Sequence, residues 1–242
     1  MARARLYGVS NEKVQSERPE KNASPGNARV VIIEDQRLVA DFFVLHCRAM
    51  RLNVLAAYTT LAEGLGGVRQ SQPDLLLLDF SLPDGNGLEA AKTLLADFPG
   101  MKILGISSHR DPWTMLQVQR IGLHGFVDKH EQRTEVLTEA ILTVLAGRIY
   151  YVPVVNEATA SLRRDPNAFI RVLSDYELRI LSHIGESMSD EEIAVVLNIS
   201  PATMQSRRRD IMRKLDIHTT PKLIHFAIVN GLTRFEQLNK RP

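Results

Sequence analysis

Four consecutive leucines followed by an aspartate, Leu75–Leu78 and Asp79, restrict the possible folds more than any other segment. A continuous apolar run of this length is typical of a central strand in a parallel sheet, because helices cover both of its faces. An aspartate directly after the run would lie at the carboxyl end of the strand, where open α/β sheets place their functional sites. The run therefore predicts an architecture and one candidate site residue.

Short apolar strands alternate with amphipathic helices on both sides of this run. Further strands are predicted at 30–33, 54–58, 103–106 and 125–127, and helices at 36–50, 61–69, 87–97, 111–121 and 134–146. Five βα units in succession predict a doubly wound, five-stranded parallel sheet of the α/β class.

The pattern changes at three places along the chain. Residues 1–28 are polar and are predicted to be a disordered N-terminal extension. Residues 29–147 hold the βα units, and 148–172, which include Pro153, lose that rhythm and are interpreted as a linker. From 173 to 235 the pattern is helical throughout, which predicts a second, all-α domain.

Composition excludes several classes of protein. The formal net charge is +2, and the single cysteine, Cys47, makes an intrachain disulfide impossible. Cys47 shares a helical face with apolar residues and is expected in the core, in a protein of the reducing cytoplasm. No apolar run approaches the roughly 18 residues that cross a bilayer, so no membrane association is expected.

Polar side chains follow the predicted strands at their carboxyl ends. They are Glu34 and Asp35 after the first strand, Asp79 after the third, Ser107 after the fourth and Lys129 after the fifth. Carboxylates that converge repel each other, and a hard divalent cation with oxygen ligands, Mg²⁺ above all, relieves the repulsion. A lysine and a hydroxyl can hold an anionic oxygen. An aspartate in such a site can act as a nucleophile and form an acyl phosphate.

Four segments, VVIIEDQRLV, PDLLLLDFSLPDGNGLEA, ILGISSHRDP and GLHGFVDKH, resemble the receiver domain of two-component response regulators in order and spacing. The resemblance covers about residues 29–147 and implies a flavodoxin-like fold. It implies that Asp79 is the phosphoacceptor and that Lys129 pairs with a phosphoryl oxygen.

The same resemblance implies a metal site and a switch. Asp35, Asp79 and the backbone carbonyl of Ser81 would bind Mg²⁺ directly, and Glu34 would act through coordinated water. Ser107 would donate its hydroxyl to the phosphoryl group and move toward it. Phe126 occupies the position of the family's switch aromatic, although a plain core role explains it as well.

Three positions are less typical of the family. Asn86 stands where an aspartate is frequent, and Gly105 is unusual in a buried strand. His109 lies two residues after Ser107, at a position that influences water access to the phosphoryl group in receivers; a solvent-exposed loop histidine is an equally good interpretation.

The second domain carries clear helix start signals. Ser174 with Glu177 and Ser189 with Glu192 form capping boxes, and Thr220-Pro221 reads as an N-cap and first helical residue. Helices at about 190–197 and 201–215 are joined by three residues, which is the length of a helix-turn-helix connection.

The helix at 201–215 has an apolar back and a basic front, as a recognition helix in the major groove requires. Met204, Ile211 and Leu215 share the apolar face. Gln205 could bond adenine, and Arg209 could bond guanine or phosphate. The candidate DNA contacts are Thr203, Gln205, Ser206, Arg209, Arg213 and Lys214, the last two at phosphates. Arg208 is expected to pack or to pair with a carboxylate.

Residues 173–232 resemble the four-helix LuxR-type DNA-binding domain over its whole length, including Thr203, the IMRKL run at 211–215 and His218. The family usually has lysine at Gln205 and histidine at Arg207, which leaves the base preference open. In this family the last helix pairs with its mate, so Leu223, Phe226 and Ala227 are the candidate dimer residues.

The two resemblances together predict a cytoplasmic transcription factor. A sensor histidine kinase would phosphorylate Asp79, which would control homodimerisation and sequence-specific DNA binding. No enzymatic activity is expected beyond self-phosphorylation from a phosphodonor and slow autodephosphorylation. The alternatives are DNA binding independent of phosphorylation, with the receiver as a docking module, and an adaptor that no longer reads DNA. An aspartate-based phosphohydrolase is disfavoured because Ser81 stands where a second acid is needed.

Overall fold

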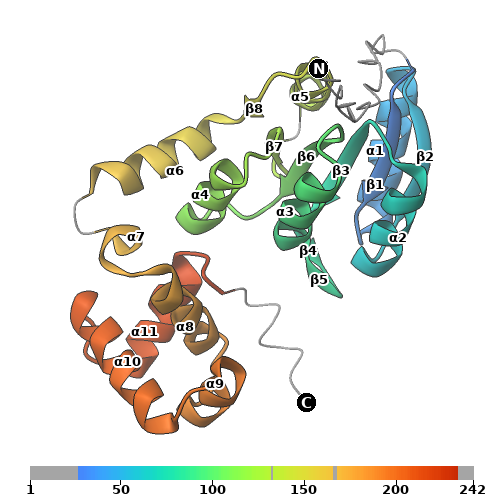
Figure 1. Cartoon of the computed structure of the whole chain (residues 1–242). Helices are drawn as coiled ribbons and strands as arrows, with labels where there is room; N and C mark the ends of the chain where they lie inside the picture. The colour runs from blue at the N-terminus through green and yellow to red at the C-terminus, as the bar shows by residue number, and fades with distance from the viewer. Residues whose placement is uncertain (1–26, 132, 166–167, 234–242) are drawn as a thin grey trace, which may run out of the picture.

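The computed structural model describes residues 27–131, 133–165 and 168–233. The predicted disordered extension therefore lies almost wholly outside the described residues. Within them an N-terminal α/β domain and a C-terminal helical domain are joined by a segment that has regular structure of its own (Figure 1).

The N-terminal domain is built on a parallel sheet with strand order β2-β1-β3-β6-β7-β8. Its strands are β1 (Arg29–Ile33), β2 (Asn53–Tyr58), β3 (Leu75–Asp79), β6 (Lys102–Ser107), β7 (Gly125–Asp128) and β8 (Tyr150–Tyr151). A short antiparallel hairpin, β4 (Ser81–Leu82) and β5 (Gly85–Asn86), follows β3. The predicted doubly wound parallel sheet is confirmed, but the predicted count of five strands was wrong.

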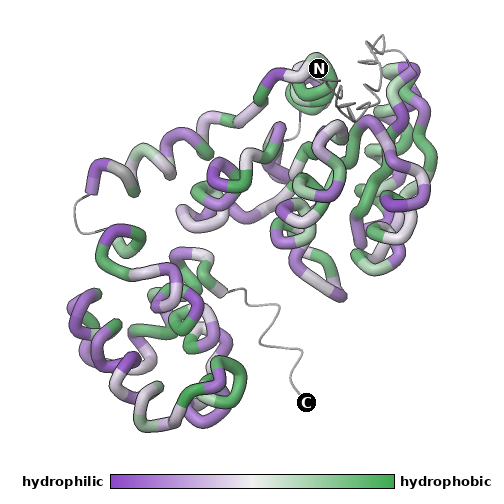
Figure 2. Tube along the Cα trace, viewed as in Figure 1, coloured by the Kyte–Doolittle hydropathy of each residue, from purple (hydrophilic) through white to green (hydrophobic). Residues whose placement is uncertain are grey.

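Helices cover both faces of the sheet. They are α1 (Arg37–Ala49), α2 (Leu61–Ser71), α3 (Gly87–Asp97), α4 (Pro112–Arg120) and α5 (Thr134–Leu145). The leucines of β3 alternate between two cores: Leu76 and Leu78 pack with α2, α3 and α4, whereas Leu75 and Leu77 pack with α1 and α5. Both faces of β3 are thus apolar, as its green colour in Figure 2 shows, and Cys47 lies in the second core as predicted.

The predicted linker at 148–172 contains three elements: β8, α6 (Pro153–Arg164) and α7 (Phe169–Val172). Tyr150 and Tyr151 pair with Gly125 and Phe126 of β7. The Tyr151 hydroxyl donates to the carbonyl of Leu123 over 2.7 Å. Helix α6 lies along α4, and its Val155, together with the N-cap residue Val152, is buried in the core on that face. A two-residue strand has no periodicity of its own, so the sequence pattern did not reveal it.

The C-terminal domain consists of α8 (Asp175–Gly185), α9 (Asp190–Leu197), α10 (Pro201–Lys214) and α11 (Thr220–Val229). Both predicted capping boxes are present, at Ser174 with Glu177 and at Ser189 with Glu192. The N-cap of α11 is Thr219 rather than Thr220, so this helix begins one residue earlier than predicted.

The unusual Gly105 in β6 makes room for an aromatic ring. A Cβ atom at this position would lie 2.3 Å from Cζ of Phe80. Phe80 in turn packs against Phe126, with 5.9 Å between the ring centroids. The glycine therefore allows a large side chain, directly after Asp79 in the chain, to enter the core.

Candidate functional site

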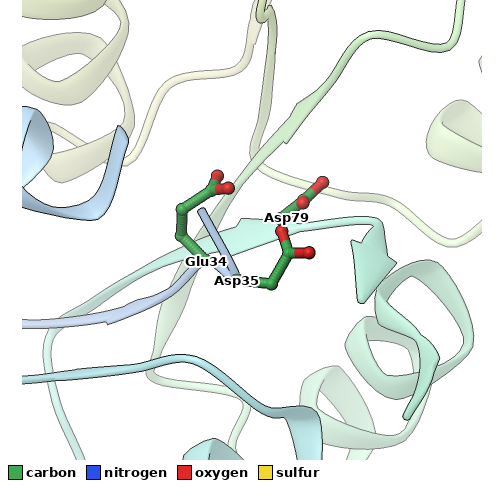
Figure 3. Close-up of side chains that lie close together, drawn as sticks. All are labelled: Glu34, Asp35 and Asp79. Atoms are coloured by element: carbon green, nitrogen blue, oxygen red, sulfur yellow. The ribbon is translucent and has the colours of Figure 1, made fainter. Parts of the chain in front are cut away.

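Three carboxylates meet at the carboxyl end of the sheet. Glu34 and Asp35 follow β1, and Asp79 is the last residue of β3. One oxygen of each lies within 4.8 Å of one oxygen of each of the others, and Figure 3 shows the three groups gathered at these strand ends. Glu34 and Asp79 are buried, with 1% and 2% of their surface exposed. Buried carboxylates are costly unless a cation or hydrogen-bond donors compensate them.

Lys129, directly after β7, supplies one compensating charge. Its Nζ donates to Oδ2 of Asp79 over 2.8 Å and to Oε1 of Glu34 over 2.9 Å. The other Asp79 oxygen, Oδ1, accepts the backbone N–H of Ser81 over 2.9 Å. The backbone N–H of Ser81 thus lies beside the carboxylate, and the metal-binding role of the Ser81 carbonyl stays a prediction.

One ammonium group does not balance three carboxylates. Burial raises the pKa of Asp79, and the charge of Asp35 adds to this, against the lowering effect of Lys129. Burial likewise raises the pKa of Glu34, with the charge of Asp79 contributing. Burial by itself would lower the pKa of Lys129, but its hydrogen bonds to Asp79 and Glu34 raise it. The site therefore favours the binding of additional positive charge.

A second observation fits a cation at this position. Oδ1 of Asp35 is buried and accepts no hydrogen bond within the described part of the chain. A buried carboxylate oxygen without a donor is rare in folded proteins and calls for an ion or a water. Carboxylate and main-chain oxygens at one sheet edge are the ligand set that hard divalent cations such as Mg²⁺ take.

The predicted hydroxyl group lies on the neighbouring strand. Ser107 ends β6 and is completely buried. Its Oγ accepts the backbone N–H of His109 over 3.1 Å, and its carbonyl accepts the N–H of Lys129 over 3.0 Å. Phe126, on β7, is completely buried as well, which fits its core interpretation. Its role as a switch stays a prediction.

Two features of the site were not found from the sequence. Gly87 begins α3 so close to β3 that a Cβ atom there would lie 2.0 Å from the carbonyl oxygen of Asp79. Asn86, noted above as atypical, is the N-cap of α3 and accepts the N–H of Leu88 over 2.9 Å. The glycine in DGNG was the available signal for this close approach.

Asp128 is the second feature that sequence reasoning missed. Its side chain is buried, pairs with Arg110 and accepts the N–H of His130 over 2.8 Å. Because Arg110 lies between β6 and α4, this ion pair ties the loop after Ser107 to the end of β7, which Lys129 directly follows. A lone aspartate beside a lysine gave no sequence signal.

Helix α10 presents the predicted recognition surface. All six predicted DNA contacts are exposed, whereas Met204 and Ile211 are buried. Arg209 is free of carboxylate partners among the described residues, and its Nε reaches only the carbonyl of Gln205 at 3.4 Å. Arg213 pairs with Asp210 over 2.8 Å at the surface. An exposed pair of this kind is weak and can exchange for a phosphate.

Lys214 has a structural partner. Its Nζ donates to both carboxylate oxygens of Glu177, each over 2.8 Å. Burial would raise the pKa of Glu177, but the bonds from Lys214 and Ser174 outweigh it and lower that pKa. Lys214 thus ties α10 to the capping box of α8. Arg208 pairs with Asp190 over 2.7 Å, as its predicted pairing with a carboxylate requires.

The predicted dimer residues are mostly unavailable for a partner. Leu223 and Ala227 are completely buried in the core of their own domain, so their assignment to a dimer surface was wrong. The apolar side chains of this ten-residue helix form one stripe, and residues of that stripe that fill the core of their own domain cannot also contact a partner. Phe226 is half-buried, and its ring contacts Phe169 edge to face at 5.9 Å.

Among the described residues, no helix combines the length and the apolar character needed to span a bilayer.

Two family models match the chain. Residues 30–141 match the response regulator receiver domain, and residues 171–227 match the luxR family of bacterial regulatory proteins. The oxygen regulatory protein NreC of Staphylococcus carnosus is 32% identical over 222 residues, which cover 86% of this chain and all of that protein. NreC of Staphylococcus haemolyticus is 29% identical, with the same coverage.

Solved structures of similar architecture align with most of the chain or with just over half of it. RcsB of Salmonella enterica serovar Typhimurium, bound to promoter rprA in the presence of a phosphomimetic, aligns with a TM-score of 0.61 at 22% identity and covers 83% of this chain and 98% of that one. A LuxR-family response regulator from Aurantimonas aligns with a TM-score of 0.52 at 26% identity and covers 57% of this chain and 99% of that one.

Proposed function

We propose, from the premise that this chain belongs to the response regulators with a receiver domain and a LuxR-family DNA-binding domain, that phosphorylation of Asp79 controls its binding to DNA. The chain is a transcription-regulating response regulator. The observation that carries the proposal is the buried cluster of Glu34, Asp35 and Asp79, with Lys129 bonded to two of its members.

The site supports a simple phosphoryl transfer. A carboxylate oxygen of Asp79 attacks the phosphorus of a phosphohistidine on a sensor kinase. The new oxygen–phosphorus bond forms as the nitrogen–phosphorus bond breaks, and the imidazole leaves with its electron pair and takes up a proton. Lys129 is already within 2.8 Å of Asp79 and can follow a phosphoryl oxygen. Ser107 can exchange its bond from the His109 amide for a bond to the phosphoryl group.

Asp35, Asp79 and the carbonyl of Ser81 would hold Mg²⁺, and Glu34 would hold it through water. The ion would offset the negative charge of the carboxylates and of the incoming phosphoryl group. The raised pKa values of Asp79 and Glu34 and the unsatisfied Asp35 oxygen support this assignment.

The DNA-binding half of the proposal rests on α10. It would enter the major groove with Gln205 and Arg209 toward base edges, and Arg213 toward phosphates. Two RcsB dimers bound to two parallel DNAs have been solved, which supports a homodimer on DNA for this chain too. A regulator of this kind acts in the cytoplasm, and we assign it no catalytic turnover beyond self-phosphorylation and slow autodephosphorylation.

The experiment compares DNA affinity with and without phosphodonor. The probe is a duplex enriched from a random-sequence pool by the full chain treated with acetyl phosphate and Mg²⁺. Acetyl phosphate should tighten binding of the wild type about 5- to 150-fold and leave Asp79→Asn unchanged. Equal affinity for both proteins under both conditions would favour the alternative, a regulator whose receiver serves only as a docking module.

A further inference from the structure

A cavity lies between α1 and α5, on the side of the sheet that these two helices cover (the α1–α5 cavity). Its volume is about 330 Å³, which falls within the range of about 300–1,000 Å³ that small-molecule sites occupy. The sheet contributes Ile106 of β6 and Val127 of β7 to its wall. Lys129 lines it as well, but no step of the proposed phosphoryl transfer uses this space.

Apolar side chains from both helices line the α1–α5 cavity. Helix α1 supplies Leu38, Val39, Phe42 and Phe43, and α5 supplies Leu137. Phe43 and Leu137 are buried, whereas Leu38 and Phe42 are 83% and 44% exposed. The cavity therefore extends from the solvent-exposed side of α1 to the apolar core.

Aromatic neighbours hold Phe42 in place. Its ring centroid lies 5.6 Å from that of Phe43 and 5.8 Å from that of His46. His46 is itself fixed by a hydrogen bond of 3.0 Å between its Nε2 and the hydroxyl of Thr138 on α5. Aromatic rings gain from stacked and edge-to-face contacts in addition to the burial of their area. A wall that contains two phenylalanine rings therefore favours an aromatic occupant.

Charged side chains at the α1–α5 cavity already have partners of opposite charge. Asp128 pairs with Arg110, and Glu131 accepts a hydrogen bond from Nε of Arg133 over 2.8 Å. Lys129 is bonded to the acidic cluster described above. Each charged side chain of the cavity wall thus has a counter-charge among the described residues. An ionised ligand would lose water without gaining such a partner, and an uncharged ligand avoids this cost.

Two uncharged polar side chains complete the lining. They belong to Gln36, the N-cap of α1, and Thr134, the first residue of α5, and both residues are exposed. The Gln36 side chain does not cap its helix. A few polar groups around an apolar wall orient the ligand in small-molecule sites. The lining therefore fits a molecule with an aromatic body and an uncharged hydrogen-bonding group.

We propose that the α1–α5 cavity is a binding site for an uncharged aromatic small molecule. Its aromatic body would lie between the two helices against Phe42 and Leu137, and its polar group would lie toward Gln36 or Thr134.

The competing occupant is a second copy of this chain, which would cover the exposed leucines of α1, Leu38 and Leu45. The depth of the cavity favours the small molecule. A protein surface laid across α1 would leave the space that reaches Ile106 and Val127 empty, and apolar side chains around an empty space lose packing contacts.

The test measures binding of N-phenylnaphthylamine, an uncharged aromatic probe that fluoresces more strongly in an apolar site. The full chain is used in EDTA, without phosphodonor or DNA. The wild type should bind one probe molecule saturably, with a Kd roughly in the micromolar range. Phe42→Asp places a charge in the cavity wall and should raise that Kd about 10-fold or more.

Leu45→Asp is the matched control. Leu45 is on the same helix and is 66% exposed, but it does not line the cavity, so the Kd of its variant should not change. Circular dichroism melting checks that both variants are folded. Diphenylamine and diphenylamine sulfonate differ in charge and serve as competitors. The uncharged one should displace the probe at a concentration about 10-fold lower.

Three results would overturn the proposal. The first is no saturable binding of the probe, or the same Kd for the wild type, Phe42→Asp and Leu45→Asp. The second is equal displacement by the two competitors, which would exclude a preference for uncharged ligands. The third comes from sedimentation velocity: a wild-type dimer that Phe42→Asp and Leu45→Asp both dissociate would assign this face to a second copy. None of these measurements involves Asp79 phosphorylation, so they are independent of the proposed function.

Discussion

Lys129 donates to Asp79 over 2.8 Å, and this bond joins the end of β7 to the end of β3 across the intervening strand β6. The contact has consequences for stability as well as for chemistry. The same ammonium group also serves Glu34, so two buried carboxylates depend on one basic side chain.

Removal of the Lys129 charge should destabilise the metal-free protein. Lys129→Met leaves the buried Asp79 and Glu34 carboxylates without a counter-charge, a change that costs up to about 3–5 kcal/mol. The loss should be largest at pH 7.5 and smaller near pH 5, where the two carboxyl groups with raised pKa values take up protons more readily. Urea unfolding in EDTA at both pH values measures it. An equal loss at the two pH values would contradict the account.

Removal of the Asp79 charge should have the opposite effect. Burial raises the pKa of Asp79 in the folded state. The ionised carboxylate therefore destabilises the metal-free fold, and the free energy of unfolding falls as pH rises from the unfolded-state pKa through the folded-state pKa. Asp79→Asn should therefore raise Tm in EDTA at pH 7.5 by roughly 2–4 °C, the shift given by about 1 kcal/mol. Mg²⁺ should stabilise the wild type more than the variant; equal stabilisation would argue against a metal site that includes Asp79.

The Glu177–Lys214 pair should support the C-terminal domain. The folded-state pKa of Glu177 is lowered, so the stabilisation from its carboxylate is complete above the unfolded value of about 4.3. That stabilisation disappears as pH falls through the folded-state pKa. Glu177→Gln should cost about 1–3 kcal/mol at pH 7 and should flatten the acid limb of the stability curve. Chemical unfolding from pH 3 to 7 tests this.

A double-mutant cycle with Lys214→Met isolates the pair itself. Strict additivity of Glu177→Gln and Lys214→Met would show that the two side chains do not interact.

Arg209 and Lys214 should behave differently in DNA binding although both are basic and exposed. Arg209→Ala should weaken binding to the enriched duplex by about 1–3 kcal/mol and change the preferred sequence, because its guanidinium has no carboxylate partner in the described structure. Lys214→Met should change stability more than affinity, since Glu177 engages its Nζ. Fluorescence anisotropy over a range of salt concentrations measures both. A larger loss of affinity for Lys214→Met than for Arg209→Ala would contradict this assignment.

The sequence was most informative where the physical constraint is local. Few structures other than a buried strand place an aspartate after four leucines, so the position of Asp79 was predicted directly. In the same way, a serine three residues before a glutamate predicted the capping box of Ser174 and Glu177. The sequence shows that Gly105 is unusual in a buried strand but not why. The structure explains it, because the Phe80 ring occupies the space that a side chain at Gly105 would need.

Features that depend on packing between distant segments were missed. Nothing in the residues of α6 says that the helix lies on α4, and Tyr150 and Tyr151 are too few to read as a strand. The sequence shows which residues of α11 are apolar, but it does not show whether they pack against their own domain or against a partner chain. Leu223 and Ala227 were therefore assigned to a partner although they fill their own core.

The intact mass of the protein after incubation with acetyl phosphate tests the central claim most directly. We expect a gain of one phosphoryl group that requires Mg²⁺, is lost in EDTA and is absent in Asp79→Asn. No gain in the wild type, or an equal gain in Asp79→Asn, would contradict the assignment of Asp79 as the phosphoacceptor.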